Sequence, residues 1–366
     1  MGEKDYYLGF SSFSGIGPIK FKIVLAKFGT AKDAWEATKS DLGKVVGEKL
    51  AIKFDEFRRK FSIADYISQL EKKDVYFVTL TEGNYPKLLK QIKNPPFVLY
   101  VKGNIEILKQ VQDDNERTIA VVGTRRTTSY GREVTTILTQ DLVLAGFTIV
   151  SGLAIGVDAI SHRTAIENGG KTIAVLGCGV DCCYPRENMA IYDGILKSGG
   201  CVISEYPLGQ PPTKGSFPAR NRIIAGLSLG VLVTEGAEDS GSLITADYGI
   251  KFGRKVFAVP GPITSSLSKG PYKLIAKGAK LVTSTKDILD DLGLRIEDLR
   301  IKKTERKGDT EEENLILKLL QNEPLHFDEL ARRTKFDSSK IGSLLSLMEI
   351  KGVIRSLDSG RFSISP

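Results

Sequence analysis

Short apolar segments recur along the middle of the chain, separated by stretches whose hydrophobic positions repeat with the period of a helix. The segments are rich in β-branched residues, and most intervening stretches are about 10 to 18 residues long, as in alternating strands and helices. The candidate strands are Thr118–Val122, Thr148–Ser151, Thr172–Leu176, Cys201–Ser204, Gly230–Thr234, Lys255–Val259 and Lys280–Val282. This alternation predicts an α/β fold, in which residues 111–295 form a Rossmann-like parallel sheet covered by helices on both faces.

Residues 1–74 carry a different pattern, which predicts several short helices. Within Ser11–Lys27, Gly15 and Gly17 form a tight turn ahead of an amphipathic segment, and this arrangement resembles a helix-hairpin-helix element. Such a turn can expose backbone N–H groups to a phosphate, but a helical packing module without a ligand explains the pattern equally well. We therefore expect a small N-terminal helical domain of the SAM or helix-hairpin-helix type.

The sequence pattern of residues 75–110 predicts an extended segment between these two regions. Val75–Leu80 and Phe97–Val101 have the composition of strands, and paired prolines precede the second of them. We expect this segment to lie as a clasp on the next domain. The polar run Gln110–Arg117 then indicates a linker.

A second charged linker, 296–312, precedes a C-terminal domain at 313–366. Three helical patterns occur there, and two short strands follow around the turn Asp358-Ser359-Gly360. The helices are expected at Asn314–Gln321, Phe327–Thr334 and Ser338–Lys351, and the strands at Val353–Ser356 and Arg361–Ser365. This order is typical of a small winged-helix domain.

Composition narrows the classes of protein that the chain can represent. No run of eighteen apolar residues predicts a membrane span, and the start MGEKDYYLGF does not have the pattern of a signal peptide, so we expect a cytoplasmic protein. The four cysteines form no C-x-x-C pair, and there are only two histidines, so we expect reduced thiols and no metal site. The net charge is +8, of which +6 falls in residues 1–110, and such a balance permits nucleic-acid binding without requiring it.

The sequence IAVVGTRRTTSYG, Ile119–Gly131, carries the most informative chemistry. An apolar strand ends at Gly123, which matches only one glycine of a dinucleotide-binding fingerprint, and Arg125 and Arg126 follow. Two guanidinium groups at the start of a helix suit phosphates but crowd out a close-fitting dinucleotide. The segment therefore indicates an extended polyanion and no redox cofactor.

Further unusual segments follow other candidate strands, at the sheet edge where ligands of such folds bind. Ser151 and Gly152 form a turn before a helix whose first turn holds Asp158, which predicts either a phosphate-binding nest or, as we favour for Asp158, a helix cap. Ser240, Gly241 and Ser242 begin another helix that could bind an anion.

The segment KGSFPARNRIIAG brings cations and an aromatic ring together. Lys214, Arg220 and Arg222 surround Phe217, and Asn221 lies between the arginines. Charge that follows a phosphate backbone, together with a ring that stacks on a base, is what a single-stranded nucleic acid requires. A solvated loop with a core phenylalanine is the simpler alternative.

In their order along the chain, these segments resemble the DNA-processing protein A family (DprA, also called Smf). The resemblance covers most of residues 80–285 through GTRRTTSYG, SGLAIGVDAISH, LGCGVDCCYP, SEYP, FPARNRIIAG, TEGAEDSGSLITA and VFAVPGP. It implies single-stranded DNA binding by the Rossmann-like domain, homodimerisation, and loading of the recombinase RecA during natural transformation or recombination. It also implies no enzymatic activity, and we expect no cofactor.

The resemblance assigns Arg125 to the family's G-x-R segment and Gly152 to its SG turn, and Arg126 stands where a lysine is common. The residues expected to bind DNA are Gly123, Arg125, Arg126, Ser151, Gly152, Lys214, Phe217, Arg220, Asn221, Arg222, Ser240, Gly241 and Ser242.

Two other functions are consistent with parts of the sequence. Glu205 and Glu235 end neighbouring strands, and paired carboxylates would suit a nucleotide-processing, phosphoribohydrolase-like enzyme. The P-G-G-x-G-T-x-x-E signature of such enzymes is not matched, and no third group completes a mechanism. A double-stranded DNA regulator is the other alternative, although the third helix of the winged-helix domain offers only Lys340 and Lys351 for base contacts.

Overall fold

The computed structural model describes residues 1–110, 117–294, 308–320, 324–357 and 360–364. The chain divides into two compact units, Met1–Ile301 and Lys302–Pro366. Most of the predicted linkers at 110–117 and 296–312 lies outside the described residues.

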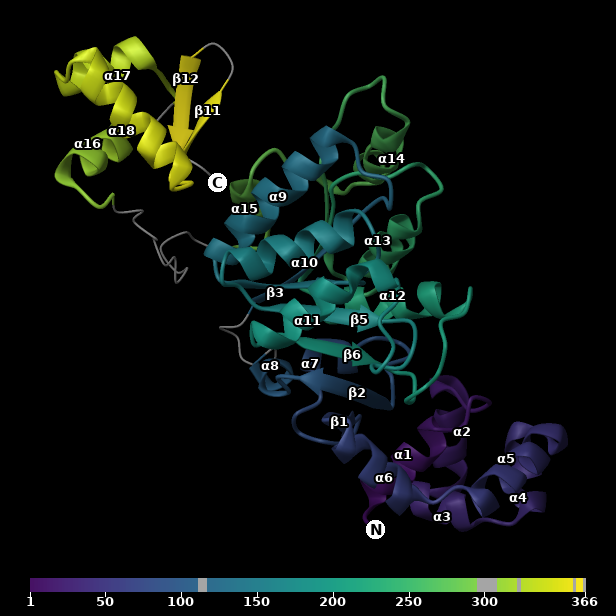
Figure 1. Ribbon diagram of the computed structural model, residues 1–366. Helices are drawn as coiled ribbons and strands as arrows, with labels where there is room; N and C mark the ends of the chain where they lie inside the picture. Colours follow the sequence, from purple (N-terminus) through teal and green to yellow (C-terminus); the bar gives the residue numbers. More distant parts are fainter. Residues whose placement is uncertain (111–116, 295–307, 321–323, 358–359, 365–366) are drawn as a thin grey trace. The chain divides into compact units, whose positions relative to one another are not determined.

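The first unit is built on one nine-stranded sheet with the order β1-β2-β6-β5-β4-β3-β7-β8-β9 (Figure 1). Its strands are β1 (Val75–Thr79), β2 (Val98–Gly103), β3 (Arg117–Val122), β4 (Phe147–Ser151), β5 (Thr172–Leu176), β6 (Cys201–Ser204), β7 (Gly230–Val233), β8 (Lys255–Ala258) and β9 (Lys280–Leu281). Seven neighbouring strands of this sheet, in the order β6-β5-β4-β3-β7-β8-β9, are parallel. Each of them begins and ends within one residue of its predicted bounds. The predicted α/β fold is confirmed.

Strands β1 and β2 extend this sheet at one edge. They pair antiparallel with each other, and β2 pairs antiparallel with β6, so that Tyr100 lies opposite Ser204. The segment predicted as a clasp on the sheet is thus part of it. The reason is nonlocal, because β2 is joined to the rest of the sheet through β6, a strand that lies far along the chain.

Alternate strand residues point into cores on opposite faces of the sheet, as the two-residue period of a strand requires. In β3, Ala120 and Val122 enter one core, and Ile119 and Val121 enter the other. The first core is covered by α7 (Lys87–Lys90), α8 (Glu106–Gln110), α12 (Ser216–Gly226), α13 (Gly241–Lys251) and α14 (Lys269–Ala276). The other face is covered by α9 (Ser129–Leu144), α10 (Val157–Glu167), α11 (Met189–Lys197) and α15 (Thr285–Asp291) (Figure 1).

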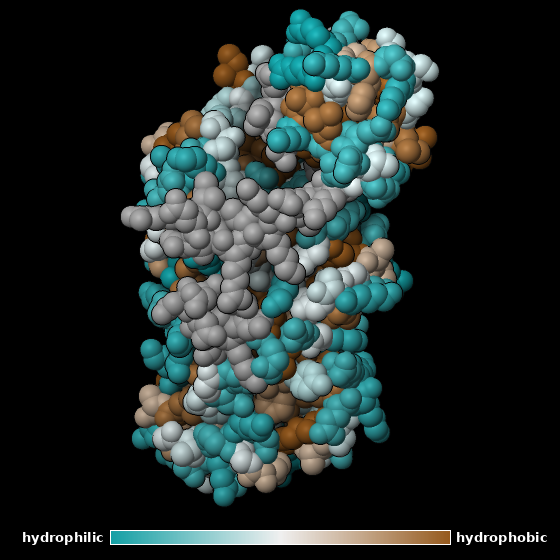
Figure 2. Space-filling model, turned by 90° about the vertical axis from the view of Figure 1, so that its left-hand side faces the viewer, coloured by the Kyte–Doolittle hydropathy of each residue, from teal (hydrophilic) through white to brown (hydrophobic). Residues whose placement is uncertain are grey.

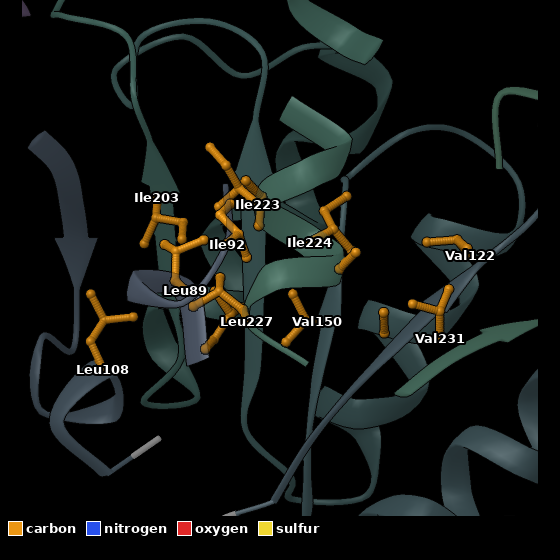
Figure 3. Packing of buried hydrophobic residues seen from close by; sticks show 14 of the residues in the cluster. Leu89, Ile92, Leu108, Val122, Val150, Ile203, Ile223, Ile224, Leu227 and Val231 are labelled. Atoms are coloured by element: carbon orange, nitrogen blue, oxygen red, sulfur yellow. The ribbon is translucent and has the colours of Figure 1, made fainter. Parts of the chain in front are cut away.

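Helix α12 is held firmly on the sheet. Its residues Ile223 and Ile224, together with Leu227 after it, lie among Leu89, Val150 and other side chains of the first core (Figure 3). This packing matters for function because α12 carries Phe217 and the arginines of the FPARNR segment.

The N-terminal helices share a core with the sheet edge. They are α1 (Glu3–Ser11), α2 (Pro18–Phe28), α3 (Ala31–Glu36), α4 (Lys39–Val46), α5 (Glu48–Lys60) and α6 (Ile63–Lys72). Aromatic rings dominate this core, in which Phe10 stacks on Phe54, and Tyr100 of β2 enters it beside Ser11. The helical region predicted for 1–74 therefore packs against β1 and β2.

The second unit contains α16 (Glu311–Leu320), β10 (Leu325–His326), α17 (Phe327–Thr334), α18 (Ser338–Ile350), β11 (Ile354–Leu357) and β12 (Arg361–Ile364). Its three strands pair in the order β10-β12-β11 around a separate apolar core. The predicted winged helix is confirmed, and only the two-residue strand β10 was missed.

None of the described helices is both long and apolar enough to cross a membrane. On the face that Figure 2 displays, hydrophilic residues are interspersed with hydrophobic ones over the described surface.

Candidate nucleic-acid interface

A groove opens where the strand order of the sheet reverses. From β3 the chain proceeds to β4, β5 and β6 on one side, whereas β7, β8 and β9 continue on the other side. The carboxyl ends of β3 and β7 are therefore the topological switch point, where open α/β sheets bind ligands. The groove there has a volume of about 790 Å³.

Most of the residues predicted to bind DNA line this groove. Those that the structure brings together are Gly123, Arg125, Arg126, Lys214, Phe217, Arg220, Asn221, Ser240, Gly241 and Ser242. Ser151, Gly152 and Arg222 are not among its lining residues.

The loop after β3 has a fixed backbone and exposed cationic side chains. A Cβ atom at Gly123 would lie 2.5 Å from Cγ2 of Val157 and 2.7 Å from the carbonyl oxygen of Glu235, so only glycine fits between α10 and the end of β7. The backbone N–H of Arg126 donates to Oγ1 of Thr124 at 3.1 Å. The side chains of Arg125 and Arg126 are exposed on this loop. The structure thus gives Gly123 a packing role and leaves both guanidinium groups accessible.

Phe217 lies at the centre of a group of planar side chains. The guanidinium carbon of Arg125 is 5.8 Å from its ring centroid, and the ring of Tyr184 is 5.5 Å away at an interplanar angle of 34°. A Cβ atom at Gly177 would approach Cδ1 of Phe217 to 3.2 Å, so the ring rests on the backbone after β5. The exposed Lys214 precedes the helix that carries this ring.

Arg220 faces inward from α12 and is only 4% exposed. Its Nη1 donates to the carbonyl oxygens of Gly152, at 2.6 Å, and of Val175, so its guanidinium group joins the ends of β4 and β5. Burial lowers the pKa of Arg220, and the nearby carboxylate of Asp158 opposes that shift. The structure therefore gives Arg220 a structural role at the groove, and its contact with a phosphate stays a prediction.

The SG turn is likewise occupied by internal contacts. Ser151 is fully buried, and its hydroxyl donates to the carbonyl oxygen of Val121 at 2.7 Å. The N–H of Gly152 donates to the Asp158 carboxylate at 3.1 Å, and a Cβ atom at Gly152 would lie 2.4 Å from Nη1 of Arg220. The pKa of Asp158 is raised, mainly because its carboxyl group is buried. Instead of forming a phosphate nest, these residues close the turn against Arg220.

Arg222 is paired with Glu205 away from the groove. Its Nη2 lies 2.5 Å from Oε2 of Glu205, and the two side chains are 12% and 10% exposed. Burial raises the pKa of Glu205, and the positive charge of Arg222 opposes that shift. Arg222 therefore serves as the partner of a buried carboxylate rather than as a free cation.

Glu235, the other carboxylate considered for catalysis, holds the start of α9. Its oxygens accept from the backbone N–H of Thr128 at 3.0 Å and from the Thr128 hydroxyl at 2.7 Å, and the residue is 3% exposed. Thr128 in turn caps α9 by accepting from the N–H of Gly131. Both carboxylates of the enzyme hypothesis are thus engaged in structural contacts.

The third wall of the groove is the start of α13. Ser240 caps this helix, and its hydroxyl lies 2.8 Å from the hydroxyl of Ser242. Asn221 on α12 donates its Nδ2 to the carbonyl oxygen of Gly241 at 3.2 Å, which ties the two helices together. The predicted helix start is confirmed, and its binding of an anion stays a prediction.

Tyr184 was missed at the sequence level. Its segment LGCGVDCCYP was used only as one of the motifs of the family resemblance, yet the ring of Tyr184 is 46% exposed and lines the groove. An aromatic residue after a strand end was the available signal.

The neighbouring thiols are free, and burial raises the pKa of Cys178 to about 12 and that of Cys183 to about 11. Among the described residues, no group of three His, Cys, Asp or Glu side chains is placed to hold a metal ion.

The fold and the groove define a Rossmann-like protein with a cationic and aromatic crevice at its switch point and a winged-helix unit at its C-terminus. Residues 76–293 match the family model of DNA recombination-mediator protein A, and residues 302–360 match the DprA winged helix domain. The chain belongs to the DNA recombination-mediator protein A family, also known as DprA or Smf.

Curated relatives agree with this assignment. Protein Smf of Synechocystis sp. is 39% identical over 293 residues, which cover 80% of this chain and 73% of that protein. The DNA processing protein DprA of Bacillus subtilis is 44% identical over 215 residues, which cover 59% of this chain and 70% of that protein.

Two solved structures share the fold. The X-ray structure of DNA processing protein A from Streptococcus pneumoniae matches with a TM-score of 0.66 and 37% identity, over 79% of this chain and 97% of that one. DNA processing protein A from Helicobacter pylori, studied for its single-stranded DNA binding mode, matches with a TM-score of 0.53 and 32% identity, over 61% of this chain and 97% of that one.

Proposed function

We propose that the groove binds single-stranded DNA and that the chain acts on it as a recombination mediator. The observation that carries this proposal is the placement of three exposed cations, Arg125, Arg126 and Lys214, around Phe217 at the switch point. Cations neutralise the phosphates of a strand while an exposed ring stacks on a base. The relative from Helicobacter pylori, described by its single-stranded DNA binding mode, supports the same ligand.

We further propose that the protein works as a homodimer that loads RecA onto the bound strand during recombination or natural transformation. The family's description as a recombination mediator supports this assignment. Co-sedimentation of RecA with strand-bound protein, compared with RecA and DNA alone, tests the loading step. The dimer is tested by sedimentation of the full chain over a range of concentrations.

The test of the binding site is the salt dependence of affinity for an oligothymidylate. Arg125→Ala should weaken binding about ten-fold or more, because a charge-assisted phosphate contact is lost. It should also make the plot of log affinity against log salt less steep, by about 0.7 for each phosphate contact that is lost.

Arg163→Ala is the matched control, because Arg163 is an exposed arginine on α10 that is not among the groove-lining residues. It should leave both affinity and slope unchanged. Equal behaviour of the two variants would remove Arg125 from the binding site.

A further inference from the structure

Tyr184 and Phe217 form a continuous aromatic surface on one wall of the groove. They come from different elements, Tyr184 from the loop after β5 and Phe217 from the first turn of α12. Their ring centroids are 5.5 Å apart, and their planes are inclined by only 34°. Tyr184 is 46% exposed, so its ring faces the solvent of the groove rather than the core.

The loop that carries Tyr184 is held in place by hydrogen bonds on both sides of the ring. The N–H of Gly179 donates to the carbonyl oxygen of Gln210 at 3.0 Å, and the hydroxyl of Tyr192 donates to the carbonyl oxygen of Val180 at 2.6 Å. Next to the tyrosine, the thiol of Cys183 donates to the carbonyl oxygen of Pro185 at 3.4 Å. The exposed ring is therefore prepositioned, which lowers the entropic cost of binding a ligand against it.

We infer that Tyr184 and Phe217 are a stacking site for two consecutive unpaired bases, and that this site favours single-stranded over double-stranded DNA. The inference rests on the proposed single-strand function and adds a second base position to it. Every base has a π-face that can stack on an aromatic ring, so the site tolerates any sequence.

The need for free base faces accounts for the selectivity. A base stacks on Tyr184 or Phe217 only through a face that no neighbouring base covers. Inside a duplex both faces of each base are covered by the neighbouring base pairs, so a base must leave the helix before it reaches either ring. A single strand presents such faces without that cost.

The ring of Tyr184, rather than its hydroxyl group, makes the contact. Among the described residues, the hydroxyl of Tyr184 makes no hydrogen bond, whereas its ring contacts Phe217. Tyr184→Phe is therefore a matched control that retains the aromatic surface, and Tyr184→Ala removes it.

The experiment measures affinity for three probes of equal length: an oligothymidylate, an abasic oligonucleotide and a duplex. Tyr184→Ala should weaken oligothymidylate binding roughly 5- to 150-fold, the range expected for loss of one stacked base. Its salt slope should equal that of the unsubstituted protein, because stacking releases no counterions. Tyr184→Phe should bind as the unsubstituted protein does.

The abasic probe and the duplex provide the decisive comparisons. Tyr184→Ala should bind both as the unsubstituted protein does, so that its preference for single strands falls by the same factor as its oligothymidylate affinity. A circular dichroism spectrum and melting curve that match the unsubstituted protein would confirm that the exposed substitution leaves the fold intact.

The outcomes separate this inference from the function on which it rests. If Arg125→Ala weakens oligothymidylate binding and Tyr184→Ala does not, the second base position is overturned and the proposed function stands. An equal loss on the abasic probe would also overturn it, since no base is then involved. If the unsubstituted protein binds none of the probes, both proposals fail.

Discussion

Three of the arginines predicted to bind DNA have three different surroundings. Arg125 is exposed beside the ring of Phe217, Arg220 is buried against two carbonyl oxygens, and Arg222 is paired with Glu205. The side chains are chemically identical, so only their neighbours decide which one is free to neutralise a phosphate. Arg125 satisfies that condition, whereas the other two are engaged in contacts that stabilise the fold.

The structural role of Arg220 predicts a large loss of stability when it is replaced. Arg220→Met would leave the Asp158 carboxylate and two carbonyl oxygens buried without their positive partner, which costs on the order of 3–5 kcal/mol. Urea denaturation followed by circular dichroism measures this free energy of unfolding. Arg125→Met is the control and should change it by less than about 0.5 kcal/mol, because that side chain is exposed. Equal losses of stability in the two variants would contradict the structural role of Arg220.

At the scale of elements, the walls of the groove are helices and loops that are joined to one another by hydrogen bonds. The loop after β3 is fixed by Glu235 at the end of β7, and α12 is tied to the start of α13 through Asn221. Such cross-links keep the side chains of the groove at set distances before any ligand arrives. Preorganisation of this kind retains more of the interaction energy as affinity.

Glu235 provides the test at this scale. The Glu235 carboxylate accepts one hydrogen bond on each oxygen, from the backbone N–H and the hydroxyl of Thr128. In Glu235→Gln, the amide has only one acceptor oxygen, so one of these two donors loses its partner. We expect a loss of about 1–3 kcal/mol in the free energy of unfolding, measured by urea denaturation. Thr127→Val, next to the same site, is a control with a smaller expected loss.

The same variant tests the enzyme hypothesis. The unsubstituted protein, incubated with a panel of nucleotides, is expected to release no free base, as measured by chromatography. If the unsubstituted protein releases free base and Glu235→Gln does not, the carboxylate is a general base, and the assignment of a purely structural role to Glu235 is wrong.

At the scale of the whole molecule, the described residues that line the groove all belong to the unit Met1–Ile301. The two lysines considered for base contacts are engaged by acidic residues of the same unit: Lys340 pairs with Glu312 at 2.5 Å, and Lys351 pairs with Asp309 and Glu313. These ion pairs disfavour a role of α18 in reading base edges. We expect this unit instead to contact a protein or another subunit.

Removal of the winged-helix unit tests this division. A fragment of residues 1–301, which has its own apolar cores, should bind an oligothymidylate within about two-fold of the full chain, since it retains every groove residue. Fluorescence anisotropy of a labelled oligonucleotide measures both affinities. A loss of more than ten-fold would place part of the binding surface in the C-terminal unit.

The sequence by itself determined the parallel sheet, the winged helix and the segments that surround the groove, because strand period, helix period and turn residues are local signals. Only the tertiary structure decided that β2 joins β6, since that pairing connects segments far apart in the chain. It also decided which arginines are exposed and placed Tyr184 beside Phe217. A residue type states which contacts a side chain can make, whereas packing between distant segments determines which of those contacts it makes.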